Sequence, residues 1–370
     1  MKILHIIPSL DKGGAERLTL YIVKSLKDIP HVEVALVIFR NQNNYSFLTD
    51  EIDFEIIPSF YTPSLKGKGK KDVKDLQDYI DSFKPDIIHS HLFETEVVLS
   101  QVKLMKDVKR VVHFHDNMNQ LKRVKLKSIH NKATLTNYYE RKIVLKSWSK
   151  NRTQTIAISK DTEKFIDKNI PHKFKATFLK NGINVKRFEN NTTVDKENRM
   201  VIIGSLVDKK GQQLAIESIA ELVKRGYDYQ LDILGYGNDF EKLKKLIKTL
   251  ELEKYVFLHG NVDFPEVFLH KAKVYLHTAK YEPFGLVILE AMAAGLPVVC
   301  TDGYGNRDLI KEGKNGFMIS ERNPSLIADK IELLMGDDDL RATMGNFANR
   351  YSHKFDISIY TKELMGLYLS

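Results

Sequence analysis

The sequence predicts an α/β protein made of two doubly wound parallel-sheet domains. The chain has 370 residues, of which 43% are hydrophobic and 28% charged, so it is globular and too long for one ordinary core. Short apolar runs alternate with longer segments of helical period, which is typical of parallel strands joined by crossover helices. The pattern runs through once before residues 190–199 and again after them.

The expected strands form two series. The first occupies residues 2–7, 32–39, 54–57, 86–90, 110–114, 155–158 and 176–179, and the second occupies 200–206, 229–235, 255–260, 274–278, 296–300 and 317–320. Residues 190–199 are polar and lack apolar periodicity, as expected of a linker. We therefore predict an N-terminal domain over 1–188, a C-terminal domain over 189–345, and a C-terminal helix over 346–370 that packs back towards the first domain. Residues 64–74, rich in Gly and Lys, are expected to form a loop.

The cysteine count and the hydropathy of the chain indicate its compartment. Cys300 is the only cysteine, so no intrachain disulfide can form and a reducing compartment is expected. The N-terminal stretch lacks the long apolar core of a secretory signal, and no run of eighteen apolar residues occurs. We expect a cytoplasmic protein, either soluble or peripheral at the inner face of the cell membrane.

Positive charge is concentrated in residues 103–150. This segment has thirteen Lys or Arg residues against three acidic ones, a net charge of +10, while the whole chain carries +9. Its basic residues alternate with apolar ones and with Tyr138, Tyr139 and Trp148, which fits a helix lying on an anionic bilayer. It fits equally an amphipathic helix with a solvated basic face. No zinc-finger, RNA-recognition or homeodomain signature occurs, so nucleic acid is not an expected partner.

Glycine-rich loops follow several of the expected strands. In doubly wound sheets, ligands bind beyond the carboxyl ends of the strands. Gly13 and Gly14 follow the first strand, Lys210 lies in a loop that begins at Gly204, and further glycine loops lie at 234–239 and 301–309. Such glycines let a phosphate approach helix N–H groups, and a lysine there can neutralise a departing pyrophosphate. The fingerprints of P-loop NTPases and serine hydrolases are absent.

Two glutamates form the most informative pair in the chain. Glu282 and Glu290 flank a glycine-containing apolar turn. Glu282 is expected on a loop and Glu290 within the helix that follows, so both can reach one ligand. We interpret the pair as half of a sugar-nucleotide site.

Histidines stand in two pairs near the ends of two strands, at His89 and His91 and at His113 and His115. Alternate residues of a strand point to opposite faces, so we expect one histidine of each pair to pack inside and the other to face the cleft. The spacing lacks supporting cysteines or an HExxH helix, so no metal site is expected. His115, followed by Asp116 and Asn117, is the histidine that we assign to the cleft.

These motifs together resemble the retaining glycosyltransferases of the GT-B fold, specifically the bacterial enzymes of glycosyltransferase family four. The resemblance is carried by GGAER (13–17), PDIIHSH (85–91), VVHFHD (111–116), AISK (157–160), LKNGINVKRF (179–188), GSLVDKKG (204–211), LDILGYG (231–237), EPFGLVILEAMAAGLPVV (282–299) and NGFMI (315–319). It implies two Rossmann-like domains facing a cleft, an N-terminal one for the acceptor and a C-terminal one for the nucleotide sugar. It also implies transfer of a hexose or N-acetylhexosamine, with retention, from a UDP-type donor to a saccharide or lipid-linked acceptor in surface polysaccharide or glycoconjugate synthesis. Neither a cofactor nor a metal is expected.

The resemblance also assigns roles to residues. It implies a catalytic set of His115, Lys210 and Glu282, a donor-binding set of Gly14, Ser205, Lys210, Gly235, Glu282, Phe284, Gly285, Leu286 and Glu290, and an acceptor-binding set of His91 and Asn117. Glu282 would contact sugar hydroxyls, Glu290 the ribose, and Lys210 the diphosphate together with the Gly14 amide. In the family an arginine usually follows the glycine at 204, whereas this chain has Ser205.

With both glutamates committed to hydroxyls, no obvious nucleophile remains for a double displacement. We therefore expect a same-face displacement in which the leaving phosphate oxygen accepts the acceptor's proton while the domains close over the donor. Two alternatives stay open: a sugar-nucleotide epimerase of the same architecture, and a non-catalytic nucleotide-sugar-binding relative.

Overall fold

The computed structural model describes residues 1–64, 69–124, 131–189 and 195–370. They form two compact units, an N-terminal unit of residues 1–181 and 357–370 and a C-terminal unit of residues 182–356. This division precedes the predicted boundary at 188/189 because helix α7 (Val185–Phe188) packs on the C-terminal unit, where Arg187 pairs with Glu266 at 3.0 Å. Of the predicted linker, residues 190–194 lie outside the described residues.

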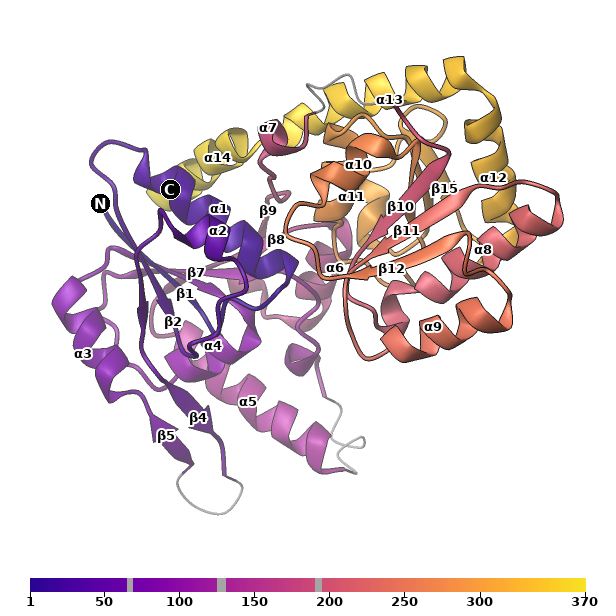
Figure 1. Cartoon of the computed structure of the whole chain (residues 1–370). Coiled ribbons are helices and arrows are strands. Elements are labelled where there is room, and N and C mark those ends of the chain that lie inside the picture. The colour runs from indigo at the N-terminus through magenta and orange to yellow at the C-terminus, as the bar shows by residue number, and fades with distance from the viewer. Residues whose placement is uncertain (65–68, 125–130, 190–194) are drawn as a thin grey trace. The chain divides into compact units, whose positions relative to one another are not determined.

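The N-terminal unit is built on a parallel sheet with the strand order β3-β2-β1-β6-β7-β8-β9. Its strands are β1 (Lys2–Ile7), β2 (Glu33–Ile38), β3 (Phe54–Ile56), β6 (Ile87–His91), β7 (Lys109–Phe114), β8 (Arg152–Ala157) and β9 (Ala176–Phe178). The helices are α1 (Gly14–Lys27), α2 (Ser46–Thr49), α3 (Lys74–Phe83), α4 (Leu92–Leu99), α5 (Lys132–Trp148) and α6 (Lys160–Asn169), with short 3-10 turns at Asn119–Leu121 and His172–Phe174 (Figure 1). Each strand predicted in the first series is present.

A short antiparallel hairpin was not predicted. Strand β4 (Phe60–Thr62) pairs with β5 (Lys70–Asp72), so Phe60 lies opposite Asp72. The prediction of a loop over 64–74 is therefore wrong for β5, and its residues 65–68 lie outside the described residues. All three residues of this strand are exposed and none is apolar, so it carries no apolar pattern.

The C-terminal unit repeats the architecture with the parallel order β12-β11-β10-β13-β14-β15. Its strands are β10 (Arg199–Ile203), β11 (Gln230–Leu234), β12 (Val256–Gly260), β13 (Val274–His277), β14 (Val298–Thr301) and β15 (Gly316–Ile319). Its longer helices are α8 (Gln212–Lys224), α9 (Phe240–Thr249), α10 (Glu266–Lys271), α11 (Leu286–Ala293), α12 (Pro324–Gly336) and α13 (Asp338–Ser352). The predicted second series of strands is present throughout.

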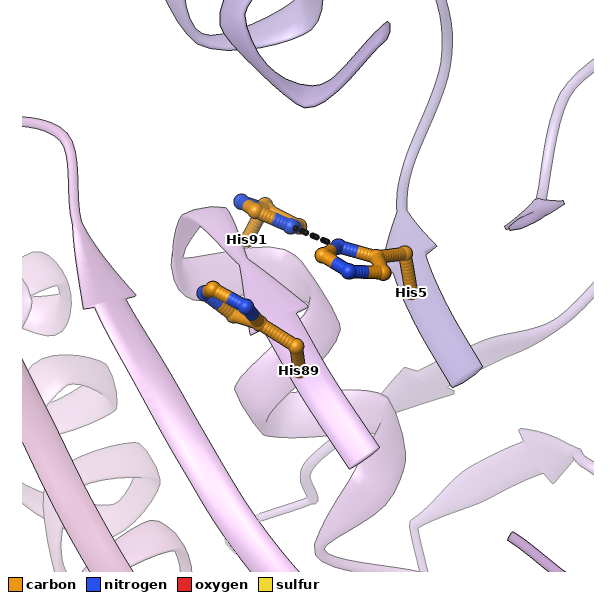
Figure 2. A group of neighbouring side chains, drawn as sticks. All are labelled: His5, His89 and His91. Carbon is orange, nitrogen blue, oxygen red and sulfur yellow. Dashed lines mark hydrogen bonds between the residues drawn. The ribbon is translucent and has the colours of Figure 1, made fainter. Parts of the chain in front are cut away.

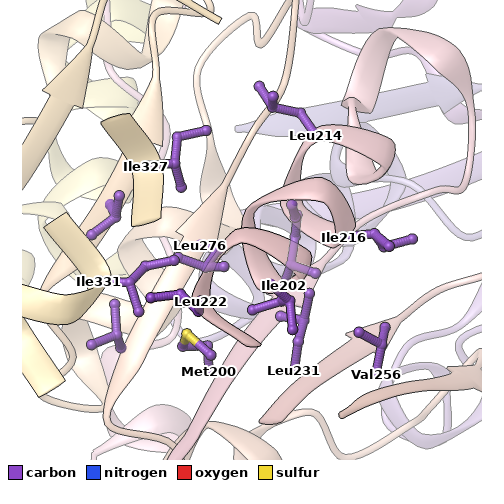
Figure 3. Close-up of a cluster of buried hydrophobic side chains, with 14 of the residues drawn as sticks. Met200, Ile202, Leu214, Ile216, Leu222, Leu231, Val256, Leu276, Ile327 and Ile331 are labelled. Atoms are coloured by element: carbon purple, nitrogen blue, oxygen red, sulfur yellow. The ribbon is translucent and has the colours of Figure 1, made fainter. Parts of the chain in front are cut away.

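The core of the C-terminal unit explains why its strands are nearly continuous apolar runs. Met200 and Ile202 of β10 are buried together with Leu222 of α8 and Ile331 of α12 (Figure 3). A parallel sheet covered by helices on both faces buries most of each strand. Full burial of a side chain of this kind stabilises the fold by about 1.5–3 kcal/mol.

Both sheets change winding direction at one point. In the N-terminal unit that point lies between β1 and β6, and in the C-terminal unit it lies between β10 and β13. Connections leave these neighbouring strands in opposite directions, which opens a crevice beyond their carboxyl ends where ligands bind in this class of sheet. The candidate functional residues should therefore gather after these four strands.

The last helix returns to the N-terminal unit. Helix α14 (Ile357–Leu369) lies beside α1 (Figure 1), while α13 stays with the C-terminal unit. The Lys109 ammonium of β7 donates to the carbonyl groups of Leu367 and Tyr368. The end of the chain is thereby anchored to the first residue of β7, an inner strand of the N-terminal sheet, whereas the predicted returning helix spanned the whole of 346–370.

The basic segment 103–150 is not one surface helix. Lys109 and Arg110 belong to the buried strand β7, and α5 places Trp148 in the core with no exposed surface. The interpretation of Trp148 as a bilayer-contacting residue is wrong, because its indole donates to the buried Glu96 carboxylate at 2.6 Å. Residues 125–130 of the segment lie outside the described residues. Across the described ranges, no helix has the length and apolar character needed to cross a membrane.

A buried ion pair inside the N-terminal unit gives a stability prediction. Glu96 accepts from Arg110 at 2.7 Å, and both side chains are fully buried. Glu96→Ala leaves a buried guanidinium unpaired, so we expect the free energy of unfolding of this unit to fall by about 3–5 kcal/mol. Urea titration followed by the fluorescence of Trp148, the single tryptophan of the chain, measures it.

Glu94 provides the matched control on the same helix. It pairs with Arg40 at the surface, so Glu94→Ala should cost about 0–1 kcal/mol. Equal losses for the two variants would contradict the structural role of Glu96.

Candidate functional site

A buried carboxylate lies at the winding switch of the C-terminal unit. Lys210 follows β10, His277 ends β13 and Glu282 follows β13. The Lys210 ammonium donates to Glu282 Oε2 at 2.6 Å, and His277 Nε2 lies 3.0 Å from the same oxygen. Glu282 is 6% exposed. Its buried carboxylate contacts a side chain from each of the two strand ends that flank the switch point.

The charge state of Glu282 follows from these contacts. Burial alone raises the pKa of a carboxyl group, but the Lys210 ammonium and the His277 imidazole outweigh it and hold the pKa of Glu282 well below its usual range. Glu282 is therefore ionised near neutral pH and is a hydrogen-bond acceptor only.

A glycine loop fixes the backbone of Glu282 from behind. The Glu282 N–H donates to Gly303 O at 2.8 Å, and the Gly305 N–H donates back to Glu282 O at 3.0 Å. A Cβ at Gly305 would lie 1.9 Å from Pro283 O, so only glycine fits there. Tyr304 between them has φ +73°, an uncommon conformation for a non-glycine residue that often marks functional loops.

Helix α11 begins directly after this carboxylate. Gly285 precedes it with φ +106°, and Leu286 is its first residue, so the free N–H groups of the first turn lie next to Glu282 in sequence. Phe284 is packed at 2% exposure, and Glu290 lies in the same helix with no exposed surface. The structure thus places the predicted pair of glutamates on the loop and the helix where the sequence put them.

Two further glycine loops touch one another. Gly235, which follows β11, has φ +137°, and a Cβ there would lie 2.1 Å from Gly204 O. Gln212 donates to the carbonyl of Ser205 at 3.0 Å, and Ser205 is exposed. Gly235 and Ser205 therefore lie on adjoining loops above β10 and β11.

In the N-terminal unit, Gly14 opens helix α1 and is exposed. The Tyr45 hydroxyl holds the preceding residue, because it accepts from Gly13 N at 2.9 Å and donates to Gly13 O at 2.7 Å. Burial raises the pKa of Glu16, in the first turn, to about 7. Neither Tyr45 nor Glu16 was singled out from sequence.

Five histidines gather at the winding switch of this unit, namely His5 of β1, His89 and His91 of β6, His113 of β7 and His115 just after β7. Figure 2 shows three of them. His89 and His91 stack at 4.5 Å between ring centroids, and His113 and His115 at 4.0 Å. The expectation that the members of each pair face opposite sides is wrong, because residues two apart in a strand share a face.

Two groups of these histidines could hold a metal ion by proximity, His5 with His89 and His91, and His91 with His113 and His115. However, two nitrogen pairs lie only 2.9 and 2.8 Å apart, His5 Nδ1 with His91 Nε2 and His91 Nδ1 with His115 Nε2. Those are hydrogen-bond distances, and ligands around one zinc at about 2.0–2.1 Å stand further apart. The absence of a metal remains a prediction.

Asn117 lies beyond the histidines. Its amide donates to Asp161 at 2.8 Å, and it lines a hollow of about 740 Å³ together with Tyr61, Phe93 and Glu140. Leu92, which follows His91, also lines this hollow and has φ +66°. Of the predicted acceptor residues, Asn117 borders the hollow, whereas His91 is fully buried.

His277 is the C-terminal residue that sequence reasoning missed. It ends the strand VYLH, and the only available signal was its position five residues before Glu282. Because a histidine at a strand end is usually structural, that position alone does not identify it.

The fold and these sites define the class: a two-domain α/β protein of the GT-B architecture. Residues 12–187 match the family model described as Glycosyltransferase Family 4, and residues 185–351 match the model described as Glycosyl transferases group 1. The two matches together run through most of the chain. The chain belongs to the GT-B glycosyltransferases that these two models describe.

Individual relatives agree with this assignment. The chain is 35% identical over 158 residues to a Bacillus subtilis poly(glycerol-phosphate) alpha-glucosyltransferase, covering 42% of this chain and 24% of that protein. It is 30% identical over 234 residues to the Staphylococcus aureus capsular polysaccharide biosynthesis glycosyltransferase CapM, covering 58% and 61%. It thus spans less than two thirds of either relative.

Among solved structures, Anabaena HepE in complex with UDP-glucose shares the fold. The TM-score is 0.80 at 21% identity, and the match covers 99% of both chains.

The buried histidines predict a pH dependence of stability. Burial lowers the pKa of all five, to about 3 for His5 and His113 and well below the usual value for His89, His91 and His115. Unfolded histidines titrate near 6.5, so below that pH only the unfolded state binds these protons. Stability should therefore fall between pH 6.5 and 5.0, by up to about 1.4 kcal/mol per pH unit for each proton.

Urea titration followed by Trp148 fluorescence at pH 7.5, 6.5, 5.8 and 5.0 measures this slope. The raised pKa of Glu16 has the opposite effect, because it increases stability as the pH falls. It is one group, however, against five histidines. A midpoint that stays constant or rises from pH 6.5 to 5.0 would show that the histidines are not buried as neutral rings.

Proposed function

We propose that the protein transfers a hexose or N-acetylhexosamine from a uridine diphosphate sugar to a saccharide acceptor, free or lipid-linked, with retention of the anomeric configuration. One observation carries this proposal: Lys210 and Glu282 meet at 2.6 Å at the winding switch of the C-terminal unit. A cation for a leaving diphosphate and a carboxylate for sugar hydroxyls are thus supplied by neighbouring strands. The HepE structure that shares the fold holds UDP-glucose, which supports uridine diphosphate as the carrier.

The donor is recognised by three features of the C-terminal unit. The first-turn N–H groups of α11, at Leu286, attract the diphosphate. Glu290, four residues on, is buried and suited to accept from ribose hydroxyls. Glu282 remains ionised and accepts from hydroxyls of the sugar, while Lys210 neutralises the charge that develops on the departing phosphate.

The low pKa of Glu282 supports our proposal of retention. A general base works best with a pKa near the operating pH, whereas the pKa of Glu282 is held well below its usual range. We propose that the leaving phosphate oxygen instead accepts the acceptor's proton on the face from which it departs. The backbone amides and Lys210 supply the positive charge for this step, so we expect activity to persist in a metal chelator.

The acceptor is assigned to the N-terminal unit. The hollow beside Asn117 combines the rings of Tyr61 and Phe93 with the polar side chains of Asn119 and Glu140. Rings and a few polar groups of this kind suit a saccharide, while Glu140 and neighbouring acidic groups disfavour a bare diphosphate. An anionic membrane surface near the exposed basic residues of α5 remains a prediction, as do the cytoplasmic location and the absence of nucleic acid binding.

The family resemblance also implies roles at the donor for two residues of the N-terminal unit. We propose that the Gly14 amide meets the diphosphate and that His115 lies beside the sugar being transferred. Ser205 stands where the family usually has an arginine, so Lys210 would be the main side-chain cation for the leaving group.

Lys210→Ala tests the proposal. The variant is incubated with UDP-glucose or UDP-N-acetylglucosamine and a panel of p-nitrophenyl glycosides, and the release of UDP is measured. We expect its rate of UDP release to be lower than that of the wild type by about 10²–10³-fold. Lys209→Ala is the matched control, because its side chain is exposed one residue away, and it should keep most of the activity.

The products separate the alternatives. Proton NMR should show an α-glucoside from the α-linked donor. A wild-type rate for Lys210→Ala would contradict the assigned role, an epimer formed without acceptor would favour an epimerase, and donor binding without turnover would favour a non-catalytic relative.

A further inference from the structure

Three hydrogen bonds link His115 to Tyr368 of the last helix, and a fourth links Tyr368 to His89. His115 Nε2 lies 2.8 Å from His91 Nδ1, and His91 Nε2 lies 2.9 Å from His5 Nδ1, as the dashed line in Figure 2 marks. His5 Nε2 lies 3.4 Å from the Tyr368 hydroxyl, which lies 2.6 Å from His89 Nδ1. We call His5, His89, His91, His115 and Tyr368 the histidine chain. His113 stacks on His115 but is not part of it.

The side chains of the histidine chain are buried and uncharged. His5, His89 and His91 have no exposed surface, His115 has 9% and Tyr368 has 4%. Burial lowers the pKa of each imidazole and raises that of the Tyr368 hydroxyl. Each ring therefore holds one hydrogen, on one of its two nitrogens.

Because each neutral ring can donate from only one nitrogen, the hydrogen bonds of the histidine chain can run in only two arrangements. If Tyr368 donates to His89, its oxygen accepts from His5 Nε2, His5 Nδ1 accepts from His91 Nε2, and His91 Nδ1 accepts from His115 Nε2. His115 then presents a bare Nδ1. If Tyr368 donates to His5 instead, every hydrogen shifts to the other nitrogen, and His115 presents Nδ1–H.

The distances favour the first arrangement. The Tyr368–His89 contact, at 2.6 Å, is the shorter of the two made by this hydroxyl, and such a length is typical of an O–H donor. His89 Nε2 has no hydrogen-bond partner among the described residues in either arrangement. The surroundings of His89 Nε2 therefore do not distinguish the two arrangements.

We propose that Tyr368 is a positioning residue, which fixes His115 in the Nε2–H tautomer through His5 and His91 so that a bare Nδ1 faces the transferred sugar. The consequence for turnover rests on the proposed function, whereas the tautomer does not. An acceptor nitrogen can take a hydrogen bond from a sugar hydroxyl, whereas the other tautomer could only donate.

Tyr368→Phe tests the proposal. Without the hydroxyl, His5 Nε2 loses its acceptor and the hydrogen is better placed on Nδ1, so the histidine chain should reverse and His115 should become the Nδ1–H tautomer. Long-range proton–nitrogen NMR of the full chain labelled with ¹⁵N-histidine reads this directly, with the His115 signals assigned by their loss in His115→Gln.

Tyr360→Phe is the matched control. Tyr360 lies on the same helix at 2% exposure, and its hydroxyl meets no partner among the described residues. This variant should leave the His115 tautomer and the kinetics unchanged. In Tyr368→Phe we expect kcat to fall about 10-fold at unchanged affinity for UDP, because no member of the histidine chain is a proposed contact of UDP itself. This fold-change corresponds to about 1.4 kcal/mol.

The outcomes separate the two proposals. An unchanged His115 tautomer in Tyr368→Phe, the same shift in Tyr360→Phe, or stoichiometric zinc bound by the purified protein would overturn the role of Tyr368. A shifted tautomer in a protein that transfers no sugar would keep the coupling and overturn the proposed function.

Discussion

The site in the C-terminal unit depends on keeping one buried carboxylate ionised. Glu282 has almost no contact with water, and burial of an unpaired charge is costly. Lys210 and His277 compensate for this, and each is positioned by a different strand of the winding switch. The glycine loop at 303–305 then fixes the backbone of Glu282, so the carboxylate is held beside Lys210 and His277.

The same topology produces the second site. Each unit has its candidate functional side chains at the place where the sheet changes winding direction, between β1 and β6 or between β10 and β13. The chemistry there differs. The C-terminal switch is charged and surrounded by glycine loops, which suits a diphosphate, whereas the N-terminal switch is filled with neutral imidazoles, which suit hydroxyl groups.

The sequence predicted the regular features well and the long-range ones poorly. Apolar runs predicted the strands of both sheets, and spacing placed Glu282 and Glu290 correctly on a loop and a helix. The β4–β5 hairpin was missed because its exposed residues carry no apolar pattern. The core position of Trp148 was missed, and a membrane contact stayed open for it, because its partner, Glu96, is distant in sequence. Tyr368 could not be linked to His89, since only the return of α14 brings them together.

We propose that the C-terminal unit binds a uridine nucleotide through α11, the helix that contains Glu290. Calorimetric titration of the intact chain with UDP, with Glu290→Gln as the isosteric variant, tests it most directly. Loss of a hydrogen bond to a charged group costs about 1.5–3 kcal/mol, so the affinity of Glu290→Gln should be lower by about 10- to 100-fold. Equal affinities, or no binding of UDP by the wild type, would contradict the account.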